Sequence, residues 1–170
     1  MAEFDFTNFN DSGFTVVEAG RYAAKTTGWK YRVKENGNQV FYIDIEINGG
    51  DYDGETMRYF HTVTDNKKSK GFFLRLLREL SIIKDGDRER GGKEKNLHVK
   101  ADYGDKDDNG YVEIPTITVN GEKRKVAGLK TTAVVINKPN NETGDTEHWV
   151  DRLETAGSTA SGVKSSNFPV

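Results

Sequence analysis

The sequence predicts a mainly β protein that contains one amphipathic helix. Within residues 39–47 the side chains alternate strictly from residue 41 on, which is typical of a strand with one buried face. Phe41 and the three isoleucines point one way, and Tyr42, Asp44 and Glu46 point the other way. Residues 69–83 carry apolar side chains at steps of three and four, which is typical of a helix with one buried side. The chain has 18 glycines against 3 prolines, which favours tight turns between strands. A single helix among strands needs a sheet or barrel to cover its apolar side.

Two strands are expected at the start of the domain. Residues 14–33 are rich in β-branched and aromatic residues, and Gly20 and Gly28 indicate bends or bulges in one long, curved strand. The Asn-Gly pair at 36–37 favours a hairpin turn, because it tolerates positive φ angles. It leads into residues 39–47, whose isoleucines share the buried face.

The third strand and the helix follow. Residues 55–64 form the third strand, and two alternate sets of side chains compete for its buried face. Residues 69–83 form the helix. Ser69 is its expected N-cap, because the hydroxyl can accept a hydrogen bond from a free N–H of the first turn. Gly86 suits the exit of the helix.

The second half of the domain is predicted to contain two or three more strands. Residues 85–96 are charged and are expected to form a surface loop. Strands follow at 97–103 and 111–119, and a last one lies within 123–136. The apolar alternation of the middle strand shifts at Pro115, which indicates a bulge or an edge position.

The polar C-terminal part is predicted to be a flexible tail. Residues 1–136 are expected to form the domain, and residues 137–170 contain too little apolar material to order by themselves. Residues 140–170 carry five acids and two bases, a net charge of −3, whereas the whole chain has a net charge of −2. The remainder is therefore nearly balanced, so a local basic stripe on the domain is compatible with the composition.

This order of elements is that of the OB-fold. Three strands, a helix and then further strands form a small barrel, in which strands 2 and 3 face the ligand. We therefore expect an OB-like barrel of five to six strands, with one α-helix between strands 3 and 4.

Several function classes lack their sequence signals. The chain has no cysteine, no phosphate-binding glycine loop and no nucleophile elbow. No apolar run is long enough for a membrane helix, and the acidic N-terminus is unlike a signal peptide. Residues 105–110 begin like a calcium loop, but its twelfth position is Thr116 where a glutamate is needed. We expect no catalysis, no cofactor, no metal and no membrane contact.

Interleaved rings and cations indicate binding to single-stranded nucleic acid. Such proteins combine aromatic rings, on which bases stack, with a cationic groove for the phosphates. Trp29 and Tyr31 share one side of their strand and are expected to form a platform, with Lys30 and Arg32 on the other side. The predicted stacking residues are Trp29, Tyr31, Tyr42, Tyr59 and Phe60, and the predicted phosphate ligands are Lys30, Arg32, Arg58, Lys67, Lys68 and Lys70.

Two other function classes remain open. A metal-dependent nuclease needs converging carboxylates, and Asp44, Glu46 and Asp102 lie on predicted outward faces. The third reading is a structural or interaction barrel without a role in nucleic-acid binding. The sequence also leaves open whether copies of the chain associate with one another.

The chain resembles a family of bacteriophage proteins first catalogued as a domain of unknown function. The matching segments are FDFTNF, EAGRY, NGNQVFYIDIEI, DYDGETMRYF and FFLRLLREL, within residues 4–120. The family is regarded as single-stranded DNA-binding and occurs with phage replication and recombination genes. The resemblance implies an OB-like fold, binding of single-stranded DNA without catalysis, and replication or recombination proteins as partners. The place of action would be the host cytoplasm.

Overall fold

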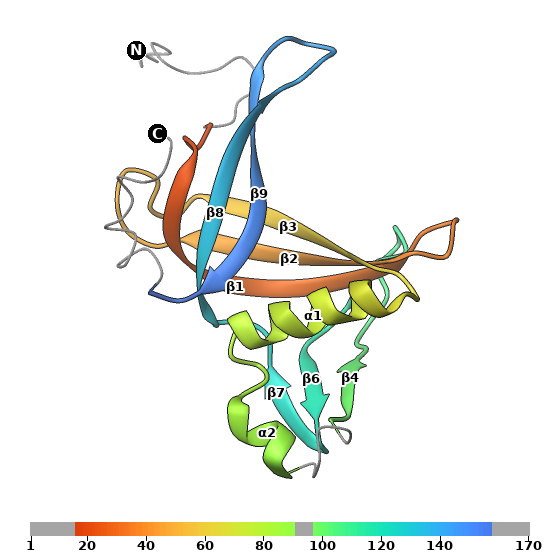
Figure 1. Cartoon of the computed structure of the whole chain (residues 1–170). Helices are drawn as coiled ribbons and strands as arrows, with labels where there is room; N and C mark the ends of the chain where they lie inside the picture. The colour runs from red at the N-terminus through yellow and green to blue at the C-terminus, as the bar shows by residue number, and fades with distance from the viewer. Residues whose placement is uncertain (1–15, 91–96, 158–170) are drawn as a thin grey trace, which may run out of the picture.

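The computed structural model describes residues 16–90 and 97–157, and its architecture is mainly β with antiparallel sheets (Figure 1). The predicted helix between the third and fourth strands is confirmed as α1, and a second, short helix follows it. In chain order the elements are β1 Gly20–Val33, β2 Gln39–Ile47, β3 Thr56–Val63, α1 Lys67–Glu79, α2 Asp85–Arg90, β4 Val99–Asp102, β5 Val112–Glu113, β6 Thr116–Val119, β7 Glu122–Lys125, β8 Lys130–Pro139 and β9 Thr146–Thr155.

The larger sheet is strongly curved but not closed. Its strands follow the order β3-β2-β1-β8-β9, and the short β5 also pairs with β1. The first part of β1 pairs with β8 and its later part with β2, so the sheet bends along this one long strand (Figure 1). The edge strands β3 and β9 come close together. No backbone ladder joins them within the described residues, so the sheet does not close into a barrel. We call this junction the seam.

A bulge in β1 decides which of its side chains face the core. The register shifts between Thr26 and Gly28, as the glycine predicted. Before the bulge, Ala24 and Thr26 are buried, and after it Trp29 is buried instead. An extra residue reverses the alternation of a strand, because successive side chains point to opposite faces. The outer face of β1 therefore carries Lys30 beyond the bulge.

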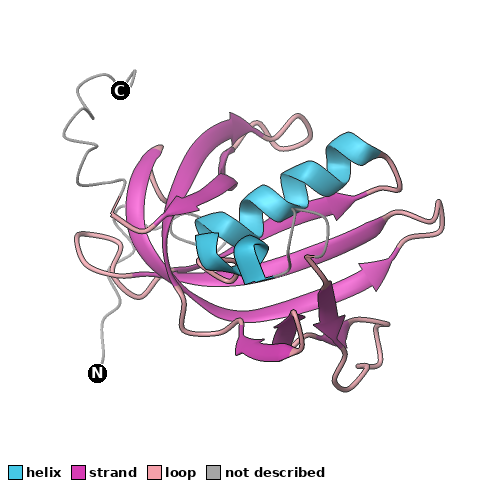
Figure 2. Ribbon diagram, turned by 60° about the horizontal axis from the view of Figure 1, so that its bottom comes forward, coloured by secondary structure: helices cyan, strands magenta, loops and turns pink. Residues whose placement is uncertain are grey.

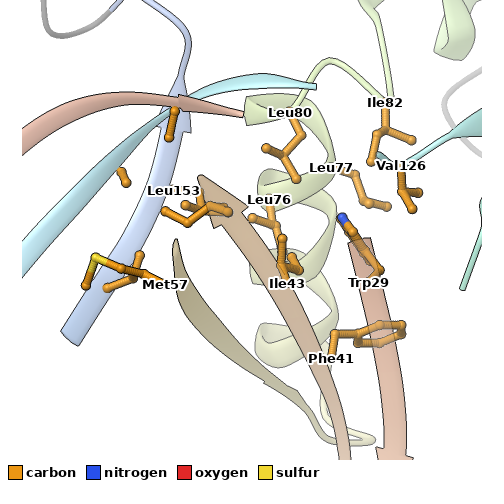
Figure 3. Close-up of a cluster of buried hydrophobic side chains, with 14 of the residues drawn as sticks. Trp29, Phe41, Ile43, Met57, Leu76, Leu77, Leu80, Ile82, Val126 and Leu153 are labelled. Atoms are coloured by element: carbon orange, nitrogen blue, oxygen red, sulfur yellow. The ribbon is translucent and has the colours of Figure 1, made fainter. Parts of the chain in front are cut away.

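The helix α1 covers the inner face of the larger sheet (Figure 2). Its N-cap lies three residues earlier than predicted, because Asn66 rather than Ser69 caps the helix and accepts a hydrogen bond from the Ser69 N–H at 2.7 Å. Leu76 and Leu77 are buried against strand side chains that include Ile43 (Figure 3). No helix of the described residues is long and apolar enough to cross a membrane.

A smaller sheet, in the order β4-β6-β7, forms a second layer beyond α1 (Figure 1). Pro115 lies between β5, which pairs with β1, and β6, which pairs with β4. The shift of alternation at this proline therefore marks the point where the chain passes from one sheet to the other. The predicted loop at 85–96 is wrong in its first part, because residues 85–90 form α2.

The predicted flexible tail is also wrong in its first part. The expected domain boundary at residue 136 falls inside β8, and β9 lies wholly within the predicted tail. β9 pairs with β8 through nine residue pairs and buries Val150 and Leu153 in the core. The rest of the predicted tail and the aromatic segment at 4–9 lie outside the described residues.

Candidate nucleic-acid interface

Four aromatic side chains form a continuous row across the outer face of the larger sheet. We call Trp149, Phe60, Tyr42 and Tyr111 the aromatic row. Neighbouring ring centroids are 6.4 Å apart for Trp149 and Phe60, 5.2 Å for Phe60 and Tyr42, and 5.1 Å for Tyr42 and Tyr111. The rings come in this order from β9, β3, β2 and the residue before β5, so the row runs across the strands.

The strand pairing explains why these side chains meet. Tyr42 lies directly opposite Phe60 in the β2–β3 ladder, and opposite Lys30 in the β1–β2 ladder. Paired residues project to the same face of a sheet, opposite to the face that carries Ile43. Tyr42 is only 4% exposed because its neighbours cover it, whereas Phe60 is 48% and Trp149 42% exposed. The row thus offers ring surface to solvent at its β3–β9 end.

Two arginines lie against the aromatic row. The guanidinium carbon of Arg58 is 5.6 Å from the ring centroid of Tyr42, and that of Arg32 is 5.1 Å from the centroid of Tyr111. Arg58 donates hydrogen bonds to both carboxylate oxygens of Asp44, at 2.7 and 3.2 Å, and these bonds raise the pKa of its guanidinium. Arg58 is therefore held as a cation beside the rings.

A cationic cleft continues from Arg32. It has a volume of about 700 Å³ and lies between the β1–β2 hairpin and the loop before β5. Lys34 and Lys106 line it together with Arg32, and Glu35 is the one acidic residue of its lining. No carboxylate pairs with these three cations within the described residues. Lys30 differs, because its Nζ lies 3.9 Å from Asp107 Oδ2.

Three of the predicted stacking residues point to the core instead. Trp29 is 1% exposed and packs against Phe41, with ring centroids 6.0 Å apart (Figure 3). Tyr31 faces the same side and also packs on Phe41. Tyr59 lies on the inner side of β3, opposite Ile43 in the ladder. The expected platform of Trp29 and Tyr31 is therefore wrong as a base-stacking surface, because the bulge in β1 turns these rings inward.

The three predicted lysine ligands on the helix do not join the aromatic row. Lys67, Lys68 and Lys70 all lie in the first turn of α1, which covers the inner face of the sheet. Lys68 lies 5.9 Å from the ring centroid of Phe72, and Lys70 pairs with Asp65 at 3.3 Å. They belong to a different side of the molecule from Arg58 and Tyr42.

A family model described as "Protein of unknown function (DUF669)" matches residues 2–127. The chain belongs to the DUF669 family. No curated protein matches the chain. The DUF669 match runs from before β1 to just after β7, so β8 and β9 lie outside it. The aromatic row therefore combines rings from within the DUF669 range with Trp149 from beyond it.

Sequence reasoning missed Tyr111, Trp149, Lys34 and Lys106. Trp149 lies in the segment EHWVDRL, which is too polar to signal a strand by itself. His148 and Val150 lie on the opposite face of the strand from Trp149, and this alternation is the one sequence signal for an exposed ring here. It can be recognised only once β9 is known to pair with β8 as a strand. Tyr111 and Lys106 flank a turn, and turn residues are brought to a surface by contacts that are distant in sequence.

The three carboxylates considered for a metal-dependent nuclease each interact with another side chain. Asp44 accepts from Arg58, and Glu46 lies 3.6 Å from the Nζ of Lys25. Asp102 belongs to the smaller sheet, where the hydroxyls of Thr116 and Thr118 donate to it at 2.6 and 2.7 Å and lower its pKa. Within the described residues, no group of three or more acids and histidines is placed to hold a metal ion.

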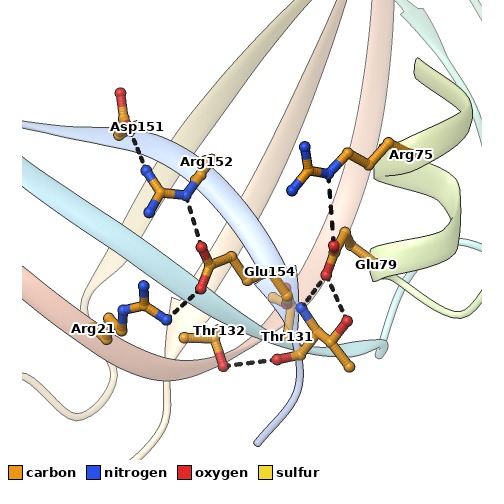
Figure 4. A network of polar contacts seen from close by, with 9 residues as sticks. Arg21, Arg75, Glu79, Thr131, Thr132, Asp151, Arg152 and Glu154 are labelled. Atoms are coloured by element: carbon orange, nitrogen blue, oxygen red, sulfur yellow. Dashed lines mark hydrogen bonds and ion pairs between the residues drawn. The ribbon is translucent and has the colours of Figure 1, made fainter. Parts of the chain in front are cut away.

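A network of polar contacts anchors β9 at the far end of the seam (Figure 4). Glu154 pairs with Arg21 of β1 and with Arg152. Glu79, in the last turn of α1, accepts from the backbone N–H of Thr155 at 2.6 Å and also from its hydroxyl. These contacts hold the C-terminal end of β9 against β1 and α1. Trp149 lies nearer the N-terminal end of the same strand, outside this network.

Proposed function

We propose that this chain binds single-stranded DNA, largely without regard to base sequence, through the aromatic row and the adjoining cationic cleft. The observation that carries the proposal is the row itself, in which guanidinium groups lie over the rings of Tyr42 and Tyr111. The other two rings of the row, Phe60 and Trp149, are half exposed. Single-strand binders use this combination because every base has a face that can stack on a ring, and every nucleotide carries a phosphate that a cation can bind. The family resemblance implies the same activity.

We further propose that the larger sheet is an OB-like barrel. An OB-fold is a partly open five-stranded barrel that binds oligonucleotides on the face of strands 2 and 3 and through two of its loops. The five-strand path with converging edge strands supports this assignment, as does the helix after the third strand. The aromatic row crosses β2 and β3, and the cationic cleft lies at the β1–β2 hairpin.

The biological role follows from the resemblance. We propose that the protein coats exposed strands during phage replication or recombination in the host cytoplasm, with replication or recombination proteins as partners. Phosphate contacts would position the strand, and ring stacking would hold the bases with little discrimination between them.

A binding experiment with three nucleic acids tests the proposal. Fluorescence anisotropy of the full chain with labelled oligo-dT, the matching duplex and an RNA of the same length should show tightest binding to the single strands. Affinity should fall with salt, with a log–log slope of about −0.7 for each phosphate contacted. Absence of binding to every single strand would overturn the proposal. Incubating the DNA with magnesium or manganese checks the nuclease reading, because a pure binder leaves the DNA intact.

A further inference from the structure

Phe60 and Trp149 face one another across the seam between β3 and β9. Their ring centroids are 6.4 Å apart, and their planes are inclined by 48°. We propose that these two rings together hold one nucleobase between them, so that the seam is a base clamp. The inference rests on the proposed function and adds a specific site to it, with one ring supplied by a strand outside the matched family range.

The exposure of the two rings singles out this place. Within the described residues the large apolar side chains that remain exposed are Val33, Phe60, Phe72, Tyr103 and Trp149. Two of them, Phe60 and Trp149, meet at the seam. Burial in the core would remove more of each ring's surface from water, yet both rings remain exposed. Tyr42 of β2 packs beside Phe60, with ring centroids 5.2 Å apart, and supports that ring from one side. A solvent-exposed ring pair with a rigid support on one side is suited to receive a planar ligand.

The present gap is slightly too narrow for a base. A base stacked on both faces needs ring centroids about 7 Å apart, which is twice a carbon–carbon contact of ~3.5 Å, and nearly parallel planes. The two rings therefore have to separate by roughly 1 Å and to rotate. Because the ring centroids are only 6.4 Å apart in the free protein, the clamp is closed until a base enters.

The seam is built so that this opening breaks no sheet hydrogen bond. β3 and β9 are the two edges of the strand path, and no ladder joins them in the part of the chain that the structure describes. β9 carries a bulge after Val150, where the register with β8 shifts, and bulges bend a strand and redirect its side chains. The polar network around Glu79 and Thr155 holds the other end of β9 in place.

A double-mutant cycle on oligo-dT affinity tests the clamp. Phe60→Ala and Trp149→Ala should each weaken binding about 5- to 150-fold. Because both rings act on one base, the doubly substituted protein should bind about as weakly as the weaker single variant. Phe72→Ala is the matched control, since Phe72 is also a half-exposed phenylalanine, at 51%, but lies on α1. It should change the affinity less than about twofold, which is within the error expected for a distant site. Trp149→Phe should retain most of the affinity, because it keeps a ring at the same place.

Tryptophan emission gives an independent reading from the same protein. The chain has two tryptophans, and Trp29 is buried while Trp149 is exposed. Oligo-dT should quench the emission of the natural protein, and the quenching should disappear in Trp149→Phe while binding persists. Losses that multiply in the double variant, or emission that is unchanged on binding, would overturn the clamp and leave the proposed function standing. Failure of the natural protein to bind any single strand would overturn both.

Discussion

The rings of Phe60 and Tyr42 pack in a T-shaped arrangement, with centroids 5.2 Å apart and planes at 79°. Tyr42 is buried under its neighbours, and Phe60 is half exposed. The two rings therefore have different roles. Tyr42 is packed into the outer face of the sheet, whereas Phe60 presents ring surface to solvent above it.

This division predicts different consequences for the two rings. We expect Phe60→Ala to change the free energy of unfolding by no more than about 1 kcal/mol, because half of the ring is already in water. Tyr42→Ala should cost about 3 kcal/mol or more, because it leaves a cavity between Phe60 and Tyr111. Urea unfolding measures both changes. Tyr42→Phe is the control, and equal losses from Phe60→Ala and Tyr42→Ala would contradict the division.

The salt dependence of binding should identify the cations that contact phosphate. Arg32→Ala and Lys34→Ala remove cations that line the cleft, so each should reduce the log–log slope for single-stranded DNA by about 0.7. Lys68→Ala removes a cation of α1 and should leave the slope unchanged. Anisotropy titrations over a range of salt concentrations supply the slopes. A reduced slope for Lys68→Ala would bring α1 back into the interface.

A buried ion pair should hold the smaller sheet to α2. Asp87 accepts two hydrogen bonds from Arg124, at 2.7 and 2.9 Å, and their side chains are only 3% and 13% exposed. We expect Asp87→Ala to destabilise the protein by about 3–5 kcal/mol, because it leaves the guanidinium buried without this partner.

The second carboxylate at this arginine provides the control. Glu122 also pairs with Arg124, at 2.8 Å, but its side chain is 59% exposed. Water screens such a pair, so Glu122→Ala should cost less than about 1 kcal/mol. Unfolding in guanidinium chloride at pH 7 compares the two variants. Similar decreases in the free energy of unfolding would show that burial does not decide the strength of the ion pair.

Stability should decrease in mild acid through His148. The Val17 N–H donates to His148 Nδ1 at 2.8 Å, so this nitrogen carries no proton, and burial lowers the pKa of the imidazole. The unfolded chain binds the proton near the ordinary pKa of about 6.5. The free energy of unfolding should therefore fall as the pH drops below about 6.5, until the lowered pKa of the folded state is reached. Burial lowers the pKa of His61 as well, which adds a loss of the same sign.

His148→Asn isolates this contribution. The Asn side-chain oxygen can still accept from Val17 but does not titrate, so the difference in melting temperature between pH 7.5 and pH 5.5 should shrink. His98→Asn is the control, because His98 is exposed and should leave the difference as it is. An unchanged difference in His148→Asn would show that another group causes the acid sensitivity.

Local patterns predicted the elements whose neighbours in sequence define their environment. The alternation of residues 39–47 correctly placed Ile43 and Tyr42 on opposite faces of the sheet, because every second residue of a regular strand shares a face. The neighbours that bury Tyr42 on the outer face could not be predicted in this way. The spacing around Leu76 and Leu77 likewise predicted the buried side of α1. For the candidate site, Tyr42, Arg58 and Phe60 followed from the same reasoning, and the structure brings them together.

By itself, then, the sequence determined the first three strands, the helix α1 and the two faces of β2, since these depend on contacts a few residues apart. Only the tertiary structure decided that Trp29 faces the core and Lys30 the surface, because one extra residue in the bulge of β1 reverses the faces. It also decided that β9 is a strand, because its order comes from pairing with β8 and not from its own composition. Trp149 reaches Phe60 through that pairing, across residues that are far apart in the chain.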